Sequence, residues 1–99
     1  MSANNRNTEN LVYKVIASLK NEEEIKMFFD DLCTNKEVEQ MTQRLMGAIL
    51  LLEKKTYQQV TSATDISSAT LSRVSRCIQY GSGGYNTLLK RYLDNEEKE

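Results

Sequence analysis

Residues 56–78, TYQQVTSATDISSATLSRVSRCI, have the pattern of two short helices joined by a tight turn. Thr56 and Gln59 form a capping box, in which the threonine hydroxyl caps the first helix and the glutamine reaches back to the start of that helix. Asp65 lies at the turn, where aspartate is one of the few residues other than glycine that tolerate a left-handed backbone. Ser67 is a suitable N-cap for the second helix. The stretch therefore predicts a helix-turn-helix.

The second helix of this motif has an inner and an outer face. Leu71, Val74 and Ile78 recur at spacings of three and four, which places them on the inner face. An ordinary helical hairpin would have the same inner face, but here the outer side chains are small, hydrogen-bonding or arginines. Such a surface suits the major groove of DNA, because hydroxyls bond base edges or phosphates and arginine can bind guanine through two hydrogen bonds. We expect base contacts from Ser68, Ala69, Thr70 and Ser72, and mainly phosphate contacts from Gln58, Arg73 and Arg76, with Thr56, Tyr57 and Ser67 completing the predicted DNA-binding set.

Composition indicates a single domain built from helices. A chain of 99 residues with 39% hydrophobic residues would have a thin core as a monomer. It has no proline and only four glycines, which is typical of helices joined by short turns. It contains no apolar run near the roughly 20 residues that span a bilayer, and its first residues do not have the pattern of a signal peptide. We therefore expect an all-α, cytoplasmic protein with no membrane partner.

The charges are unevenly distributed along the chain. The formal net charge is −1 and the pI is near 5.5, which counts against indiscriminate nucleic-acid binding. Lys54, Lys55, Arg73 and Arg76 nevertheless surround the helix-turn-helix, where Asp65 is the only acid. A local basic face on an acidic protein can still steer DNA. Because the overall basicity is weak, an alternative function stays open, in which the same helical fold docks a partner protein.

The residues that most catalytic and metal sites require are absent or scattered. The sequence has no histidine, which excludes zinc fingers and histidine-based catalysis. Cys33 and Cys77 are far apart in the sequence and are expected to be reduced, partly buried thiols. The acidic triplet Glu22–Glu24 fits the first turn of a helix better than a metal site. The glycine-rich segment 81–84 lacks the Gly-Lys-Ser/Thr ending of a phosphate loop. We expect no enzyme activity, no cofactor and no metal site.

Further helices are predicted on both sides of the helix-turn-helix. Apolar stripes predict helices over about residues 8–19, 22–32, 35–53 and 85–93, the second of them capped by Asn21. Residues 45–52, LMGAILLL, are apolar nearly all round, so they must be buried on every face. In so small a chain this predicts a central helix covered by its own neighbours and by a second subunit. The expected organisation is a disordered N-terminal tail (1–7), a helical DNA-binding domain (8–94, with the helix-turn-helix at about 56–79) and an acidic tail (95–99).

The chain resembles a known family over more than half its length. Between Thr34 and Arg76 it is similar to the Trp-repressor superfamily, and the stretches TYQQV, SSATLSRVSRCIQYG and GGY are similar to the YerC/YecD branch of that superfamily. The resemblance is most specific in Thr34-x-x-Glu37, in Gln43-Arg44 and in residues 69–73, ATLSR. It implies a six-helix, all-α protomer in an intertwined homodimer. The helix-turn-helix would be the fourth and fifth helices of each subunit.

The resemblance also implies a candidate effector pocket. In the tryptophan-responsive members of the superfamily, the amino acid lies between two arginines and beside the recognition helix. Those arginines correspond by motif position to Arg44 and Arg73, and Thr34 and Thr70 match two further pocket residues. The pocket implied for this chain is therefore lined by Thr34, Arg44, Thr70, Arg73, Val74 and Cys77.

Two of these positions depart from the tryptophan-binding pattern. Val74 stands where those repressors have a glycine, and Cys77 stands where they have a serine that helps to hold the ligand amine. A valine adds three carbons in the slot of an indole, and tight packing tolerates such additions poorly. Tryptophan is therefore not expected as the corepressor. Either Arg44 and Arg73 hold an unknown small-molecule effector, or Arg44 pairs with an acid and Arg73 touches phosphate.

Together the residues and the resemblance predict a dimeric, sequence-specific DNA-binding transcriptional regulator, and the family makes repression the expected effect. Two recognition helices would enter successive major grooves, about 34–36 Å apart, on a near-palindromic site. The expected partners are double-stranded DNA and a second copy of the chain.

Overall fold

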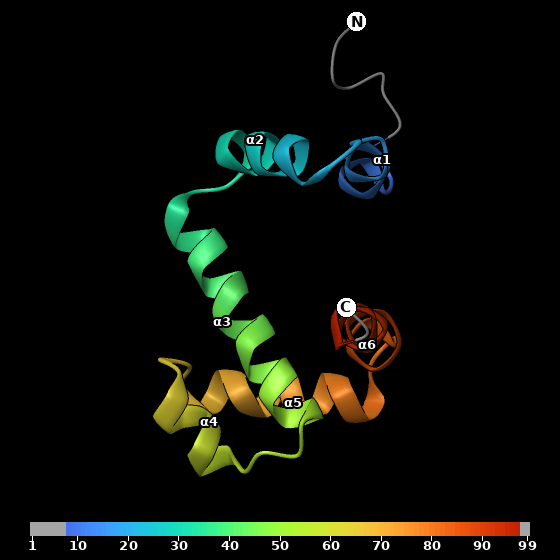
Figure 1. The fold of residues 1–99 in the computed structure, drawn as a ribbon. Coiled ribbons are helices and arrows are strands. Elements are labelled where there is room, and N and C mark those ends of the chain that lie inside the picture. Colours follow the sequence, from blue (N-terminus) through green and yellow to red (C-terminus); the bar gives the residue numbers. More distant parts are fainter. Residues whose placement is uncertain (1–7, 98–99) are drawn as a thin grey trace, which may run out of the picture. The chain divides into compact units, whose positions relative to one another are not determined.

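Residues 8–97 are described by the structure, a computed structural model, and every regular element among them is helical (Figure 1). The predicted disordered tail, residues 1–7, and the last two residues of the predicted acidic tail lie outside this described part. The chain divides into two compact units, residues 1–35 and 36–99. The prediction of a six-helix, all-α chain is confirmed.

In the first unit, α1 spans Leu11–Ala17 and is shorter than the helix predicted over residues 8–19. Its N-cap, Asn10, has a left-handed backbone (φ 60°), through which a right-handed helix cannot continue. The Leu11 N–H donates to the carbonyl of Thr8 at 3.2 Å, so the residues before α1 form a turn instead of a further helical turn.

Helix α2 spans Glu22–Leu32 and begins as the sequence predicts. Oδ1 of Asn21, the N-cap, accepts a hydrogen bond from the Glu24 N–H at 2.9 Å, and Oε1 of Glu24 accepts one from the Lys20 N–H at 2.9 Å. The acidic triplet fills the first turn of α2, where the positive end of the helix dipole stabilises its negative charges. Its interpretation as the start of a helix is confirmed.

The second unit contains the long helix, the helix-turn-helix and the C-terminal helix. Their bounds are α3 Asn35–Leu52 (whose first residue belongs to the first unit), α4 Tyr57–Ala63, α5 Ser68–Tyr80, the π-helix η2 Gly84–Leu89 and α6 Lys90–Glu97. α5 passes beside the C-terminal half of α3 (Figure 1). The predicted bounds of α3 and of both helices of the helix-turn-helix are confirmed to within a few residues.

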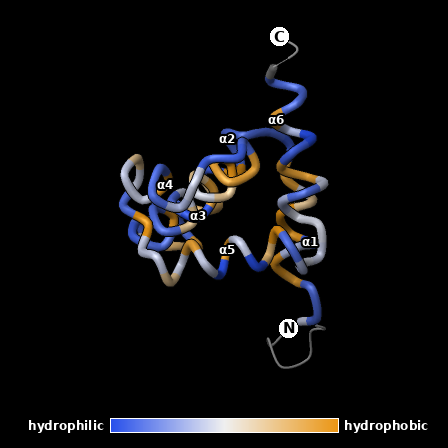
Figure 2. The backbone as a smooth tube through the Cα atoms, turned by 90° about the horizontal axis from the view of Figure 1, so that it is seen from below, coloured by the Kyte–Doolittle hydropathy of each residue, from blue (hydrophilic) through white to orange (hydrophobic). Residues whose placement is uncertain are grey.

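The last helix differs from the one predicted over residues 85–93. The chain leaves α5 at Gly81 and passes Gly83, whose left-handed φ of 99° suits a residue without a Cβ. It then forms one π-helical segment, η2, before α6. α6 continues to Glu97, so that residues 95–97 of the predicted acidic tail are helical. Figure 2 shows this last part of α6 as hydrophilic.

A small core joins the helix-turn-helix to α3. Its buried members come from α3, α4, the turn and α5: Ala48, Val60, Ile66, Leu71 and Val74. Leu71 and Val74 are almost fully buried and Ile78 packs against this core, so the predicted inner face of α5 is confirmed. Gly47 allows the close approach of α5, because a Cβ there would lie 3.0 Å from Ile66 Cδ1 and 3.3 Å from Leu71 Cδ1.

One chain buries only part of the apolar second half of α3. Gly47 and Ala48 are buried there, but Leu45 and Met46 are 45% and 42% exposed. The sequence predicts burial of residues 45–52 on every face, partly by a second subunit. Residues 49–52 are half-buried, so the single chain leaves Leu45 and Met46 exposed and the end of α3 only partly covered.

Helix α3 ends in a Schellman motif that has a lysine where glycine is usual. The Lys54 N–H donates to the carbonyl of Leu51, and the Lys55 N–H donates to the carbonyl of Leu50, both at 3.0 Å. This pair of bonds requires a left-handed residue after the helix, and Lys54 has φ 70°. An L-amino acid with a side chain is strained in this conformation.

None of the helices within residues 8–97 has the length and apolar character needed to cross a membrane.

Candidate nucleic-acid interface

The first helix of the motif, α4, begins with the predicted capping box. Thr56 Oγ1 accepts a hydrogen bond from the Gln59 N–H at 3.1 Å, and Gln59 Oε1 accepts one from the Thr56 N–H at 2.8 Å. Two backbone donors that the helix itself cannot satisfy are thereby paired. Val60 anchors α4 because its side chain is fully buried in the core.

The turn between α4 and α5 is built without a left-handed residue, so the prediction for Asp65 is wrong. The flanking caps, Thr64 (φ −135°, ψ 170°) and Ser67 (φ −74°, ψ 155°), are both extended, and the chain changes direction between them. Left-handed φ angles of residues other than glycine occur instead at Asn10 and Lys54 within the described chain. Ile66 is buried in the turn and fixes the turn to the core.

Helix α5 begins with the predicted serine cap. Ser67 Oγ accepts a hydrogen bond from the Thr70 N–H at 3.1 Å and donates one to Thr70 Oγ1 at 2.9 Å. The Ser67 hydroxyl is therefore occupied within the protein, whereas the Thr70 hydroxyl retains its own hydrogen for a further acceptor.

All ten residues predicted to bind DNA lie on α4, on α5 or at the caps of these helices. Thr70 and Ser72 are half-buried, and the others are exposed: Thr56, Tyr57, Gln58, Ser67, Ser68, Ala69, Arg73 and Arg76. Within α5, positions 69, 72, 73 and 76 have the spacing that places side chains in one stripe along a helix. This stripe lies away from Leu71 and Val74 and can therefore be presented to a ligand.

The charge of this surface is positive, although the whole chain is slightly acidic. Arg73 and Arg76 are exposed, and among residues 8–97 neither guanidinium is in an ion pair. Asp65 is the only acid between residues 54 and 80. Unpaired, exposed guanidinium groups can bind phosphate without first breaking an internal salt bridge.

The two arginines border a shallow hollow at the C-terminal half of α5. This cavity, of about 490 Å³, is lined by Arg73, Arg76, Cys77, Tyr80 and Gly81. Tyr80 is 82% exposed, and Cys77 is a free thiol that is also exposed, so the expected partial burial is found for Cys33 and is wrong for Cys77. Sequence reasoning did not select Tyr80, which extends the polar face of α5 by one turn beyond Arg76.

Five of the six residues of the candidate effector pocket lie in the second unit, and they do not line one common cavity there. Arg44 and Thr70 line one cavity of about 360 Å³, beside the turn, while Arg73 and Cys77 line the separate hollow on α5. Val74 lines neither, because it is 1% exposed and belongs to the core. Thr34 lies in the first unit, next to the first residue of α3.

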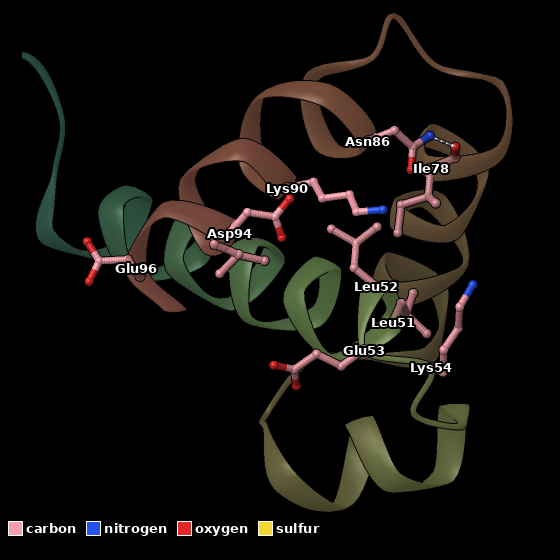
Figure 3. Close-up of a pocket in the computed structure, with 10 residues that line it drawn as sticks. Leu51, Leu52, Glu53, Lys54, Ile78, Asn86, Lys90, Asp94 and Glu96 are labelled. Atoms are coloured by element: carbon pink, nitrogen blue, oxygen red, sulfur yellow. Dashed lines mark hydrogen bonds between the residues drawn. The ribbon is translucent and has the colours of Figure 1, made fainter. Parts of the chain in front are cut away.

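A further cavity lies away from the outer face of α5. It has a volume of about 700 Å³ and lies between the end of α3, the end of α5 and α6 (Figure 3). Leu51, Leu52 and Ile78 provide apolar walls, Lys90 extends toward Leu52 and Ile78, and Asp94 lies beside Lys90. No sequence pattern predicted this cavity, because its walls come from α3, α5, η2 and α6, and the end of α3 is distant along the chain from the other three elements.

Two hydrogen bonds between different helices or turns were also missed by sequence reasoning. Gln43 Oε1 accepts a hydrogen bond from the Asp65 N–H at 3.3 Å. Asn86 Nδ2 donates one to the carbonyl of Ile78, in the last turn of α5 (Figure 3). The spacing of Gln43 and Gly47, four residues apart, is the only local sequence feature that could have suggested a shared face toward the turn. No comparable feature marks Asn86.

The chain matches a known protein family over most of its length. The family model for the Trp repressor protein matches residues 8–93. The chain belongs to this family. This match confirms the predicted resemblance. The Trp repressor family is a family of DNA-binding regulators and not of enzymes. Within residues 8–97, no group of three histidine, cysteine or acidic side chains is arranged to hold a metal ion.

Relatives within the Trp repressor family agree with this assignment. The chain is 44% identical over 85 residues to the uncharacterized protein YerC of Bacillus subtilis (strain 168), covering 86% of this chain and 82% of YerC. A crystal structure of a Staphylococcus aureus protein provisionally assigned as a Trp repressor matches with a TM-score of 0.80 and 36% identity, covering 88% of each chain. A TrpR-like protein from Eubacterium eligens ATCC 27750 matches with a TM-score of 0.78 and 37% identity, over 84% of this chain and 86% of the other. The predicted similarity to YerC is thus confirmed.

Proposed function

We propose that this protein is a sequence-specific DNA-binding transcriptional regulator that represses transcription by inserting α5 into the major groove of duplex DNA. The observation that carries the proposal is the stripe of Ala69, Ser72, Arg73 and Arg76 on α5, whose two guanidinium groups are exposed and unpaired. Small and hydroxyl side chains allow close approach to base edges, and arginines bind phosphate or guanine. Membership of a family of DNA-binding regulators supports the same function.

The regulator acts as a homodimer in this proposal. Neither α1 nor α2 has a buried residue, and several large apolar side chains of the first three helices are exposed: Leu11, Val12, Ile25, Met27, Leu32, Leu45 and Met46. So much exposed apolar surface is typical of a surface that a partner covers. A dimer would also present two recognition helices, and a two-fold symmetric protein favours a near-palindromic site. Analytical ultracentrifugation should give twice the protomer mass of 11.4 kDa.

The first experiment is the selection of bound fragments from random duplex DNA by the purified protein at physiological salt, without added ligand. Enrichment of a palindrome is the expected result. Failure to enrich any sequence would contradict sequence-specific binding, and it would favour the alternative in which the fold docks a partner protein.

The second experiment tests the assignment of the basic stripe. Arg76→Ala should weaken binding to the selected site and to unrelated duplexes by a similar factor, because a phosphate contact carries no sequence information. It should also reduce the slope of log K against log salt concentration by about 0.9, the value for one phosphate contact. Lys20→Ala removes a positive charge from a residue outside the motif and is the matched control. Equal salt slopes for Arg76→Ala and the unmodified protein would contradict the assignment.

Tryptophan is not the corepressor in this proposal. The Val74 side chain is packed in the core and has almost no exposed surface. It therefore already fills the space beside the α5 backbone that an indole ring would need. Isothermal titration with L-tryptophan should show no binding, and the amino acid should leave DNA affinity unchanged. A tryptophan-dependent gain in affinity would refute this part of the proposal.

We propose that an effector other than tryptophan binds in the cavity beside Arg44 and Thr70. The cavity beside Arg44 and Thr70 has a volume of about 360 Å³, which is within the range of small-ligand pockets. If such an effector exists, a metabolite extract should change the DNA affinity of the unmodified protein and not that of an Arg44→Ala variant. The same response from both proteins would exclude this cavity as the effector site.

A further inference from the structure

Gln43 connects the long helix α3 to the turn of the helix-turn-helix. Its side-chain oxygen, Oε1, accepts a hydrogen bond from the backbone N–H of Asp65 at 3.3 Å, across 22 residues of sequence. Gln43 is half-buried and lies in the middle of α3, and Asp65 lies between α4 and α5. This bond is therefore a polar contact between α3 and the DNA-binding motif.

The hydrogen bonds of the turn show which backbone donor this contact pairs. The Thr64 N–H donates to the carbonyl of Val60 at 3.0 Å, and the Ile66 N–H donates to Thr64 Oγ1 at 3.3 Å. Both of these donors find partners inside the helix-turn-helix. The N–H of Asp65, which lies between them, has its partner on α3. Asp65 is exposed, so this N–H would bond water if Gln43 were absent, and the side chain from α3 replaces that solvent contact with one inside the protein.

A second contact lies one helical turn further along α3. Gly47 follows Gln43 by four residues, so both positions are on the same face of the helix. The absence of a side chain at Gly47 lets Ile66 and Leu71 approach it closely. Adjacent residues of the turn thus meet adjacent turns of α3, with Asp65 at Gln43 and Ile66 at Gly47. The apolar contact is non-directional, whereas the hydrogen bond prefers one orientation.

We propose that Gln43 is a positioning residue that fixes the angle of the helix-turn-helix on α3, and thereby the separation of the two recognition helices in the dimer. This inference rests on the proposed function. α5 has 13 residues and is therefore about 20 Å long. A rotation of about 10° at the turn would displace the far end of α5 by about 3.5 Å, which is close to one base-pair step of DNA, and the middle of α5 by about half as much. A single hydrogen bond at the turn can therefore influence which half-site spacing the dimer accepts.

The experiment compares three substitutions. Gln43→Met keeps the length of the side chain and removes the acceptor, whereas Gln43→Glu keeps an acceptor at the same reach. Gln40→Met is the matched control. Gln40 and Gln43 both lie on α3 and line the cavity beside the turn, and Gln40 is exposed. Two quantities are measured for each protein. The first is hydrogen exchange of the Asp65 amide by NMR, and the second is affinity for the selected palindrome with its natural spacing and with one base pair inserted or deleted.

The expected result is specific to Gln43→Met. Exchange of the Asp65 amide should accelerate about five- to tenfold, which is the fold-change that loss of one hydrogen bond produces. The preference for the natural half-site spacing over the altered spacings should fall by a similar factor, while affinity for an isolated half-site stays unchanged. Gln43→Glu and Gln40→Met should behave as the unmodified protein does. A merely structural role would lower affinity for the half-site as well and would not alter the spacing preference.

Three outcomes would overturn the inference. If Asp65 exchanges at the same rate in Gln43→Met and in the unmodified protein, the hydrogen bond does not hold the turn. If exchange accelerates and the spacing preference is retained, Gln43 does not position the recognition helices. If the unmodified protein binds no palindrome although its Asp65 amide is protected, the proposed function itself fails, and the hydrogen bond is only part of the fold.

Discussion

Replacing Lys54 with glycine should stabilise the protein, because Lys54 has a left-handed backbone in the Schellman motif at the end of α3. The conformation costs a residue with a Cβ about 1–2 kcal/mol relative to its right-handed form, whereas glycine adopts it freely. Glycine also has a more flexible unfolded state, which offsets about 0.4–1 kcal/mol of this gain. The expected net increase in the free energy of unfolding is about 0.5–1 kcal/mol.

The assay is thermal and urea unfolding followed by circular dichroism, at one fixed protomer concentration because dimerisation would make stability depend on concentration. For a chain of this size, the melting temperature should rise by about 2–8 °C. Lys55→Gly is the matched control. It removes the same charge one residue later, where φ is not positive, and should lower the stability. An unchanged or lower melting temperature for Lys54→Gly would refute the argument that this lysine is strained.

Three further changes test contacts that hold the DNA-binding unit together, each measured as the change in urea midpoint at constant protomer concentration. Ser67→Ala removes the N-cap of α5 and should cost about 1 kcal/mol, whereas Ser67→Asp should restore most of it; equal losses would mean that the cap is not the cause. Asn86→Ala leaves the Ile78 carbonyl without its side-chain donor and should cost about 1 kcal/mol, as should Asn86→Asp, which cannot donate; full stability of either would show that this bond contributes nothing. Gly47→Val forces a branched side chain against Ile66 and Leu71 and should cost about 1–3 kcal/mol, more than Gly47→Ala; a stabilised valine variant would show that the two helices can separate without loss.

The sequence predicted those features whose interacting groups are three or four residues apart. The capping box of Thr56 and Gln59, the caps Asn21 and Ser67, and the inner face of α5 are all confirmed. In each of them the hydrogen bond or the spacing lies within one or two helical turns. Local sequence therefore contains all the atoms that form the contact.

The prediction for Asp65 failed because a turn of this length can be closed in more than one way. Aspartate tolerates the left-handed region, but tolerance does not require its use. Thr64 and Ser67 are both extended, and the chain turns between them. The left-handed residue of this part of the chain is Lys54, although lysine has no special preference for that conformation. Its backbone is set by the two Schellman hydrogen bonds and not by the side chain.

The candidate site was predicted residue by residue, but its grouping was not. The outer face of α5 follows from helical periodicity, which exposes Ala69, Arg73 and Arg76 once the inner face is known. The effector residues were assigned by motif position, and the second unit places Arg44 and Arg73 beside different cavities. Which side chains share a cavity depends on how α3 and α5 cross, and no short stretch of sequence specifies that crossing.

By itself, the sequence determined α2, α3, the caps Asn21, Thr56 and Ser67, the helix-turn-helix and the family, since each of these is contained in short-range patterns and motifs. Only the tertiary structure decided the contact between Gln43 and Asp65, the bond from Asn86 to Ile78 and the close approach of Ile66 and Leu71 to Gly47. The contacts of Gln43 and Gly47 join residues about 20 apart in the chain, and they form only where burial of the small core brings α3, the turn and α5 together. The bond from Asn86 forms where η2 folds back on the end of α5. The geometry of each contact is therefore a property of packed helices and not of any one segment.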